Sequence, residues 1–105
     1  MQAESRIKIP NGKGQMLSLA VNYPAKINDL LAILCPGFLD SKDYAHLKNL
    51  AEDLSAMGYT VVRLDPTGTW ESEGDISEYT VTQYLADINS VWQYMSNKIH
   101  IRMFC

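Results

Sequence analysis

The first part of the chain alternates apolar and polar residues with the period of two that is typical of β-strands. The alternation runs over residues 6–10 and again over residues 16–23. The intervening Asn11-Gly12-Lys13-Gly14 contains an Asn-Gly pair, which supplies the positive φ that a tight hairpin turn needs. We therefore predict an antiparallel hairpin, whose second strand places three apolar residues on one face: Leu17, Leu19 and Val21.

Two later segments are apolar almost throughout, a pattern that predicts strands covered on both faces, as in a parallel sheet. They are residues 30–35, which end at Pro36-Gly37, and residues 60–64. Arg63 interrupts the second segment, and we expect its side chain to snorkel or to find a carboxylate. Residues 99–105 predict a last strand, in which two polar residues alternate with the apolar ones: His100 and Arg102.

Apolar residues recur at three- and four-residue steps in two other segments, and this spacing predicts helices over residues 43–57 and from Thr80 to residue 95. Gly58 follows the first helix, where a C-terminal cap favours a positive φ. Thr80 and Gln83 match the capping box, with Thr80 as the cap and Gln83 reaching back, and Ser96-Asn97-Lys98 is expected to end the second helix.

The order of predicted elements is strand, strand, strand, helix, strand, helix, strand. Helical crossovers between strands predict parallel pairing in right-handed units. The fold class is therefore α/β, with three layers and a mostly parallel sheet that carries an antiparallel amino-terminal hairpin.

Composition narrows the classes of protein. The 105 residues allow one domain, and 47% hydrophobic residues allow a core. A net charge of -3 gives no reason to expect nucleic acid or an anionic membrane as partner. The amino terminus has no apolar core of a secretory signal, and no apolar run is long enough to cross a bilayer. Cys35 and Cys105 make neither a disulfide framework nor a zinc pattern, which favours a cytoplasmic location.

Sites in open α/β sheets lie beyond the carboxyl ends of parallel strands. Here those ends are Cys35-Pro36-Gly37-Phe38, then Asp65-Pro66-Thr67-Gly68, then Cys105. The loop after the second end is rich in acids, but their spacing fits no EF-hand. We expect a solvated loop, with no metal and no cofactor; its acids are Glu71, Glu73, Asp75 and Glu78.

The segment ILCPGFLDSKDYAHLKNLAEDLSAMGYTVVRLDPTGTWESEGD, with the following YTVTQYLADINSVWQYM, resembles the amino-terminal part of α/β-hydrolases, in particular their esterase, lipase and serine-peptidase-like branch. In that family the third strand ends in a His-Gly-Phe-like turn and the fourth in Asp-x-x-Gly-x-Gly-x-Ser. The fifth strand runs into the Gly-x-Ser-x-Gly nucleophile elbow. The likeness covers nearly all of the chain from Gln15 onward, and it implies that residues 1–105 are a partial α/β-hydrolase domain that ends before the elbow.

The resemblance implies that Pro36-Gly37-Phe38 is the oxyanion loop. The backbone N–H of Phe38, or that of Leu39, would stabilise the negative charge that grows on a carbonyl oxygen as it becomes tetrahedral. Gly37 would let substrate approach the backbone, and Trp70 would line a pocket or anchor its loop. Pro36 stands where the family has a histidine, which alters how the loop is braced.

Three residues match the second motif: Asp65, Gly68 and Ser72. We assign structural rather than catalytic roles to Asp65 and Ser72. The nucleophile, the acid and the base histidine come later in family order and have no matching position here. His46 and His100 are therefore expected to be surface or packing residues.

The function that the resemblance implies is that of an amino-terminal fragment of a serine hydrolase, acting by acyl transfer on small-molecule esters, thioesters or amides. An exposed last strand would favour self-association. A non-catalytic α/β module that binds a partner or another subunit remains an alternative. A receiver-like signalling domain, suggested by Asp65 at a strand end, ranks last because Cys35-Pro36-Gly37 occupies the place of its acidic cluster.

Overall fold

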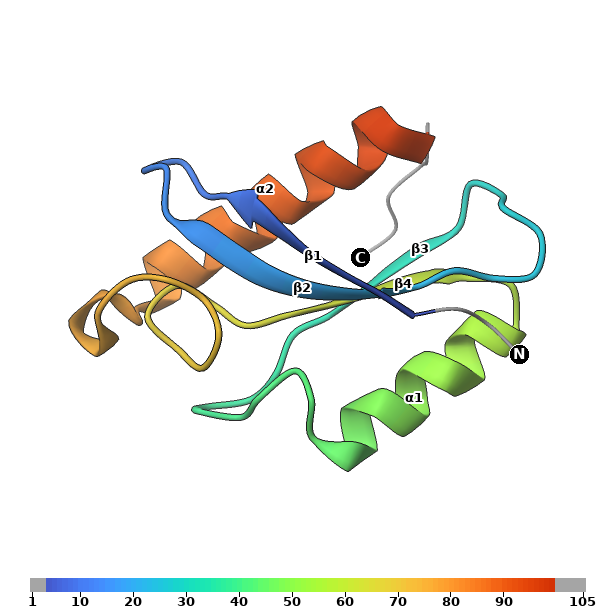
Figure 1. Ribbon diagram of the computed structural model, residues 1–105, viewed down its shortest axis with the longest axis horizontal. Coiled ribbons are helices and arrows are strands. Elements are labelled where there is room, and N and C mark those ends of the chain that lie inside the picture. The colour runs from blue at the N-terminus through green and yellow to red at the C-terminus, as the bar shows by residue number, and fades with distance from the viewer. Residues whose placement is uncertain (1–3, 100–105) are drawn as a thin grey trace.

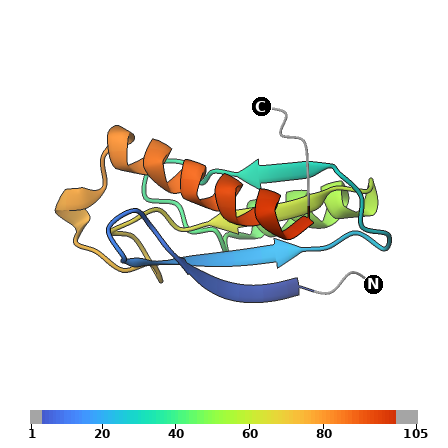
Figure 2. The same ribbon diagram turned by 90° about the horizontal axis from the view of Figure 1, so that it is seen from above.

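The computed structural model describes residues 4–99, and its helices lie on opposite faces of one sheet (Figures 1 and 2). This arrangement confirms the predicted three-layer α/β fold. The elements in chain order are β1 Glu4–Pro10, β2 Met16–Asn22, β3 Leu31–Leu34, α1 Ala45–Ala56, β4 Thr60–Leu64, the 3-10 helix η1 Ile76–Glu78 and α2 Val81–Ile99.

The sheet has the strand order β1-β2-β4-β3. β2 runs antiparallel to both of its neighbours, β1 and β4, while β3 pairs parallel with β4. The hairpin is confirmed, and the sheet formed by residues 4–99 is mixed, because it contains one parallel strand pair and two antiparallel pairs. The parallel pair matters most for function, since it brings the carboxyl ends of β3 and β4 to the same edge.

The core lies mainly between the sheet and α2. Alternate residues of the strands face that helix, as the period of two predicts. On the other face the sheet meets α1 through Leu47 and Ala51, and Arg63 is buried there against the carboxylate of Glu4. The core on the α2 side is formed by Ile9, Leu17, Leu19, Val21, Leu31, Val62, Leu64, Val91 and Met95.

The hairpin turn is closed differently from the prediction. Gly14, and not Gly12, has the positive φ, at 80°. The Asn11 side chain accepts hydrogen bonds from the amides of Lys13 and Gln15. An asparagine that bonds the backbone two residues further on makes an Asx-turn, so the positive φ moves towards the end of the loop.

The predicted C-terminal cap of α1 is confirmed. Gly58 has a φ of 105°, and its amide donates to the Ser55 carbonyl while that of Tyr59 donates to the Leu54 carbonyl. These two bonds form a Schellman motif, which satisfies carbonyls that the helix end leaves unpaired.

α2 begins as predicted but ends later. The Gln83 amide donates to the Thr80 hydroxyl oxygen at 3.1 Å, which confirms the cap, whereas the Gln83 side chain donates to Asp87 instead of reaching back. The expected end at 96–98 is wrong, because the helix continues to Ile99. That stretch contains no glycine or proline, and Lys98 in the last turn suits the helix dipole. The predicted last strand therefore cannot begin at Ile99, and its other residues lie outside the described ones.

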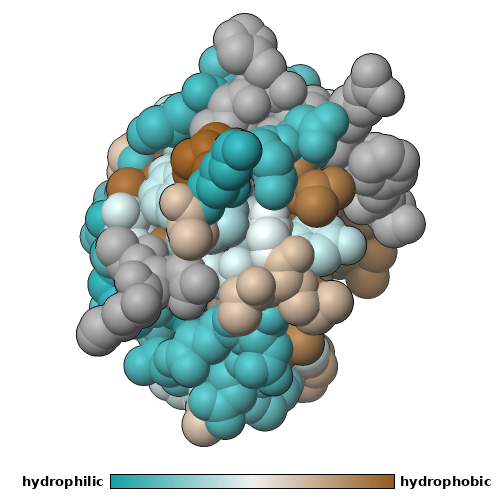
Figure 3. Space-filling model, turned by 90° about the vertical axis from the view of Figure 1, so that its right-hand side faces the viewer, coloured by the Kyte–Doolittle hydropathy of each residue, from teal (hydrophilic) through white to brown (hydrophobic). Residues whose placement is uncertain are grey.

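The surface at the far end of the molecule, away from the β3–α1 turn, is mainly hydrophilic with scattered apolar residues (Figure 3). Neither α1 nor α2 has the length and hydrophobicity to cross a membrane, among the residues described. The apolar stripe predicted for α2 is buried at Val91 and Met95 but exposed at Val81 and Leu85, near the end of β3.

Candidate functional site

The two turns singled out by the sequence meet at one edge of the sheet (Figure 1). The segment between β3 and α1 lies against the loop that follows β4. One of the hydrogen bonds that join them is made by the Lys42 amide, which donates to the buried Asp65 carboxylate at 2.9 Å. This is the location that the α/β rule predicts for a site.

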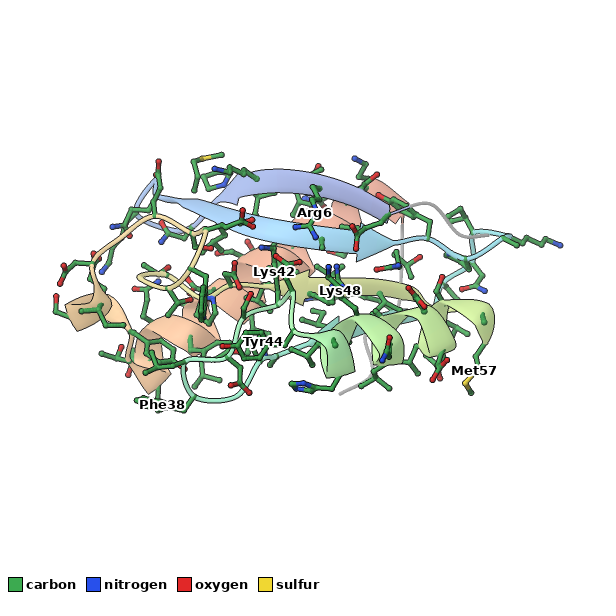
Figure 4. The ribbon with its side chains drawn as sticks, turned by 60° about the horizontal axis from the view of Figure 1, so that its bottom comes forward. Arg6, Phe38, Lys42, Tyr44, Lys48 and Met57 are labelled. Carbon is green, nitrogen blue, oxygen red and sulfur yellow. The ribbon has the colours of Figure 1, made fainter. Side chains whose placement is uncertain are left out.

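The segment after β3 makes a tight turn at its tip. The Asp40 amide donates to the Gly37 carbonyl at 2.9 Å. Leu39, the third residue of this turn, has a φ of 59°, a conformation that type II turns require there and that glycine normally provides. The Phe38 side chain is 80% exposed and lies at the outer end of the turn (Figure 4).

The two candidate oxyanion donors differ in what they bind. The Leu39 amide donates to the Tyr79 hydroxyl oxygen at 3.1 Å, so it is engaged within the protein. The amides of Gly37 and Phe38 have no hydrogen-bond acceptor among residues 4–99. Of the two candidate donors, Phe38 and Leu39, only the Phe38 amide thus lacks a hydrogen-bond partner within residues 4–99.

Trp70 reaches the same turn from the loop after β4. Its indole Nε1–H donates to the Leu39 carbonyl at 2.9 Å, and its ring meets that of Tyr44 edge-on at 5.8 Å. Trp70 itself has a positive φ of 42° and is 58% exposed. It therefore anchors its loop to the turn, and its contact with a substrate remains a prediction.

The start of the turn is held by α2. The Tyr84 hydroxyl donates to the Pro36 carbonyl at 2.8 Å. Burial raises the pKa of Tyr84, which keeps its hydroxyl protonated and able to donate. This bond braces the start of the loop at Pro36.

The end of the turn is held by a buried lysine. Lys42 is fully buried, and its Nζ lies 2.8 Å from Asp65, 2.7 Å from Glu71 and 3.1 Å from Asp43. Burial alone would lower the pKa of Lys42, but the hydrogen bonds to these carboxylates outweigh it and the pKa is raised. Arg6 of β1 lies nearby and shares Asp43 and Glu71 with Lys42 (Figure 4).

Asp43 makes the stability of this cluster depend on pH. The hydrogen bond from Arg6, helped by Lys42 and opposed by burial, lowers the pKa of Asp43 from 3.8 to about 2. A depressed carboxyl pKa stabilises the fold above the unfolded value, and that contribution is lost as the pH falls through the folded value. We expect urea unfolding to show a loss of about 1 to 2 kcal/mol from Asp43 between pH 3.8 and pH 2, after allowance for solvent screening.

The matched variants are Asp43→Asn and, as control, Asn replacing the exposed Asp29. Asp43→Asn should flatten the acid limb of the stability curve, whereas Asp29→Asn should leave its shape unchanged. Equal acid limbs in wild type and Asp43→Asn would contradict the assignment.

Residues that match the second motif hold the loop after β4 in place. The Ser72 hydroxyl accepts from the Ser18 amide at 2.8 Å and donates to the Asp65 carbonyl. Gly68 has a φ of 85°, and a Cβ there would lie 2.3 Å from the Asp75 carbonyl oxygen. A larger residue at position 68 would therefore have to displace the backbone.

The acids of this loop make contacts within the protein. Glu73 accepts from the Met16 amide, Asp75 and Glu78 form a capping box on η1, and Glu71 binds Lys42. No group of three His, Cys, Asp or Glu side chains among residues 4–99 is arranged to hold a metal ion.

Asp87 of α2 is a site residue that the sequence reasoning did not identify. It is fully buried, and its carboxylate accepts from the Thr67 amide at 2.7 Å, the Thr67 hydroxyl at 2.8 Å and the Gln83 side chain at 2.9 Å. Its spacing from Tyr84 and Val91 places it on the apolar face of the helix. A buried acid on that face needs a hydrogen-bond partner. The aspartate within the apolar stripe was therefore the sequence signal that could have identified Asp87.

One of the two histidines, His46, lies within the described residues and outside the turn. His46 is exposed on α1, beside the Tyr44 ring at 6.2 Å, as predicted for a surface residue. His100 lies outside the described residues.

No family model and no curated protein matches the sequence. Solved structures do match the fold. The α/β-hydrolase GrgF from Penicillium sp. sh18 is 23% identical with a TM-score of 0.81, over 90% of this chain and 32% of GrgF. Est1E from Butyrivibrio proteoclasticus, solved with ferulic acid, is 22% identical with a TM-score of 0.80, over 91% and 39%. An α/β serine hydrolase homologue from Coxiella burnetii is 20% identical with a TM-score of 0.78, over 91% and 47%.

This chain thus spans between about a third and a half of the length of the structures that it matches. The superposition covers about nine-tenths of this chain. The chain therefore has the α/β-hydrolase fold over the part of those structures that it matches.

Proposed function

We propose that this chain is the amino-terminal part of a serine hydrolase that acts on esters, thioesters or amides by acyl transfer, and that it supplies the oxyanion loop. The observation that carries the proposal is the Phe38 amide, which has no acceptor within the described residues 4–99 and lies in a tightly held turn at the carboxyl end of β3. In α/β-hydrolases one oxyanion donor comes from the loop after the third strand. The attacking serine, the acid and the base would come from residues beyond this chain.

The chemistry of the turn fits this part of the reaction. A carbonyl oxygen that turns into an alkoxide is stabilised by N–H groups that are already fixed in place, because no reorganisation is then needed. Hydrogen bonds from Tyr84 and to Asp65 fix the two ends of the loop, at Pro36 and Lys42. A cytoplasmic setting belongs to the same proposal and agrees with Cys35, which is a free thiol.

The test compares the 105-residue chain with the polypeptide that its gene encodes through and beyond Cys105. We expect the longer polypeptide to hydrolyse p-nitrophenyl acetate and the 105-residue chain to show only the buffer rate. Since Est1E was solved with ferulic acid, the assay includes an aromatic acyl ester. Ester turnover by the 105-residue chain would contradict the missing nucleophile, and an inactive longer polypeptide would contradict the function.

Phe38→Pro tests the donor itself. Proline removes the amide hydrogen and is favoured at the second position of a turn, so the loop can keep its shape. In the longer polypeptide we expect kcat to fall about a hundredfold. The matched control is Phe38→Ala, which also removes the phenyl ring but keeps the N–H and should stay within about threefold of wild type. Equal activities of the proline and alanine variants would show that another group is the donor.

A further inference from the structure

The two peptide groups that flank Leu39 are each held by an aromatic side chain from the loop after β4. The Leu39 N–H donates to the Tyr79 hydroxyl, and the Leu39 carbonyl accepts from the Trp70 indole. The Phe38 ring stacks on the Tyr79 ring, with centroids 5.6 Å apart. Both sides of the turn are thus attached to a second segment of the chain.

Leu39 occupies a backbone conformation that it would not adopt unaided. Leu39 and Trp70 are the two residues other than glycine with positive φ among residues 4–99, and one hydrogen bond joins them. A positive φ in a residue with a side chain costs about as much as one or two hydrogen bonds contribute, and it persists where the surroundings impose it. The two hydrogen bonds at Leu39, one from Trp70 and one to Tyr79, together contribute enough free energy to offset this cost.

We propose that Trp70 and Tyr79 are positioning residues of the oxyanion turn, which hold Leu39 at positive φ and thereby fix the direction of the Phe38 amide. The inference rests on the proposed function of that amide. Without the brace, Leu39 relaxes to negative φ and the neighbouring peptide groups rotate. The donor would then have to be reoriented in each turnover, which a fixed donor avoids.

The test measures the conformation of Leu39 in the 105-residue chain by NMR. A residue at positive φ shows a strong NOE between its own amide and α hydrogens, and amide exchange reports how often the turn opens. Trp70→Phe keeps an aromatic ring but removes the indole N–H, and it deletes no bond to the Leu39 amide. We expect it to speed exchange of the Leu39 amide about tenfold and to weaken that NOE, with little change in the urea midpoint.

Leu39→Gly provides the rescue that a merely structural contact would not show. Glycine adopts positive φ without strain, so Trp70→Phe in the Leu39→Gly background should change exchange at position 39 by less than about twofold. Tyr44→Phe is the matched control, because the Tyr44 ring touches Trp70 while its hydroxyl makes no hydrogen bond among residues 4–99. It should leave Leu39 unchanged.

Unchanged exchange and NOE at Leu39 in Trp70→Phe would overturn the proposal, as would an equal effect with and without Leu39→Gly. If Trp70→Phe unfolds the chain, recovery of a folded spectrum by Leu39→Gly supports the brace, and failure to recover overturns it. None of these measurements requires turnover. A failure of ester hydrolysis would therefore remove the oxyanion role of the turn but leave the bracing of Leu39 intact, whereas an unaltered Leu39 would remove only the bracing.

Discussion

Replacing Lys42 by methionine should lower the free energy of unfolding by about 3 to 5 kcal/mol. Lys42 and Asp65 are both fully buried, and the Nζ of Lys42 also binds Glu71 and Asp43. Removing the cation leaves the Asp65 carboxylate buried without its counter-charge, which is the expensive way to break a buried ion pair. Urea unfolding at neutral pH measures the loss.

A double variant separates the uncompensated charge from the lost packing. Lys42→Met combined with Asp65→Asn should recover part of the stability lost in Lys42→Met, because neutral groups of similar shape cost less to bury than one charge. Met replacing the exposed Lys26 is the control and should change stability by less than about 0.5 kcal/mol. If Lys42→Met were as mild as this control, the lysine would not be the anchor of the loop.

Asp87→Ala should cost about 3 kcal/mol, the second large effect that we expect. The Asp87 carboxylate is the acceptor for the Thr67 amide and hydroxyl, which are buried and cannot turn to water. Two donors left unsatisfied in the interior carry their full desolvation cost. The loop after β4 should also loosen, because Thr67 is its attachment to α2.

Two further variants are compared with Asp87→Ala: Asp87→Asn and, as a control, Asn89→Ala. Asparagine keeps one acceptor oxygen and should lose about half as much stability as alanine, while Asn89 is exposed on the same helix and its replacement should be nearly neutral. Thermal unfolding of the set ranks the variants. A loss in Asn89→Ala as large as that in Asp87→Ala would point to helix propensity in place of the hydrogen bonds.

The two helix ends could be predicted from residue types, because each depends on residues that are close in the sequence. Gly58 ends α1 with a positive φ, and Thr80 caps α2, as expected. Both depend on backbone groups within a few residues, which the sequence displays directly. The end of α2 was missed because three polar residues, 96–98, are compatible with a helix as well as with its termination.

The bracing of the turn could not be predicted in the same way. Tyr79 lies 40 residues from Leu39, and Trp70 lies 31 residues from it. No local sequence pattern predicts that Lys42, which lies between two polar residues, is fully buried. Its burial depends on the carboxylates of three other residues. Long-range polar contacts of this kind are decided when the elements pack.

By itself the sequence determined the hairpin, the parallel pair, the two helices and the position of a small turn at the carboxyl end of β3, because periodicity and turn chemistry are local properties. Only the tertiary structure decided which groups of the turn have partners. The Leu39 amide donates to Tyr79 and the Leu39 carbonyl accepts from Trp70, whereas the Phe38 amide meets no acceptor in the described part of the chain. The reason is that a hydrogen-bond donor is available or not according to which distant acceptor the fold brings within reach.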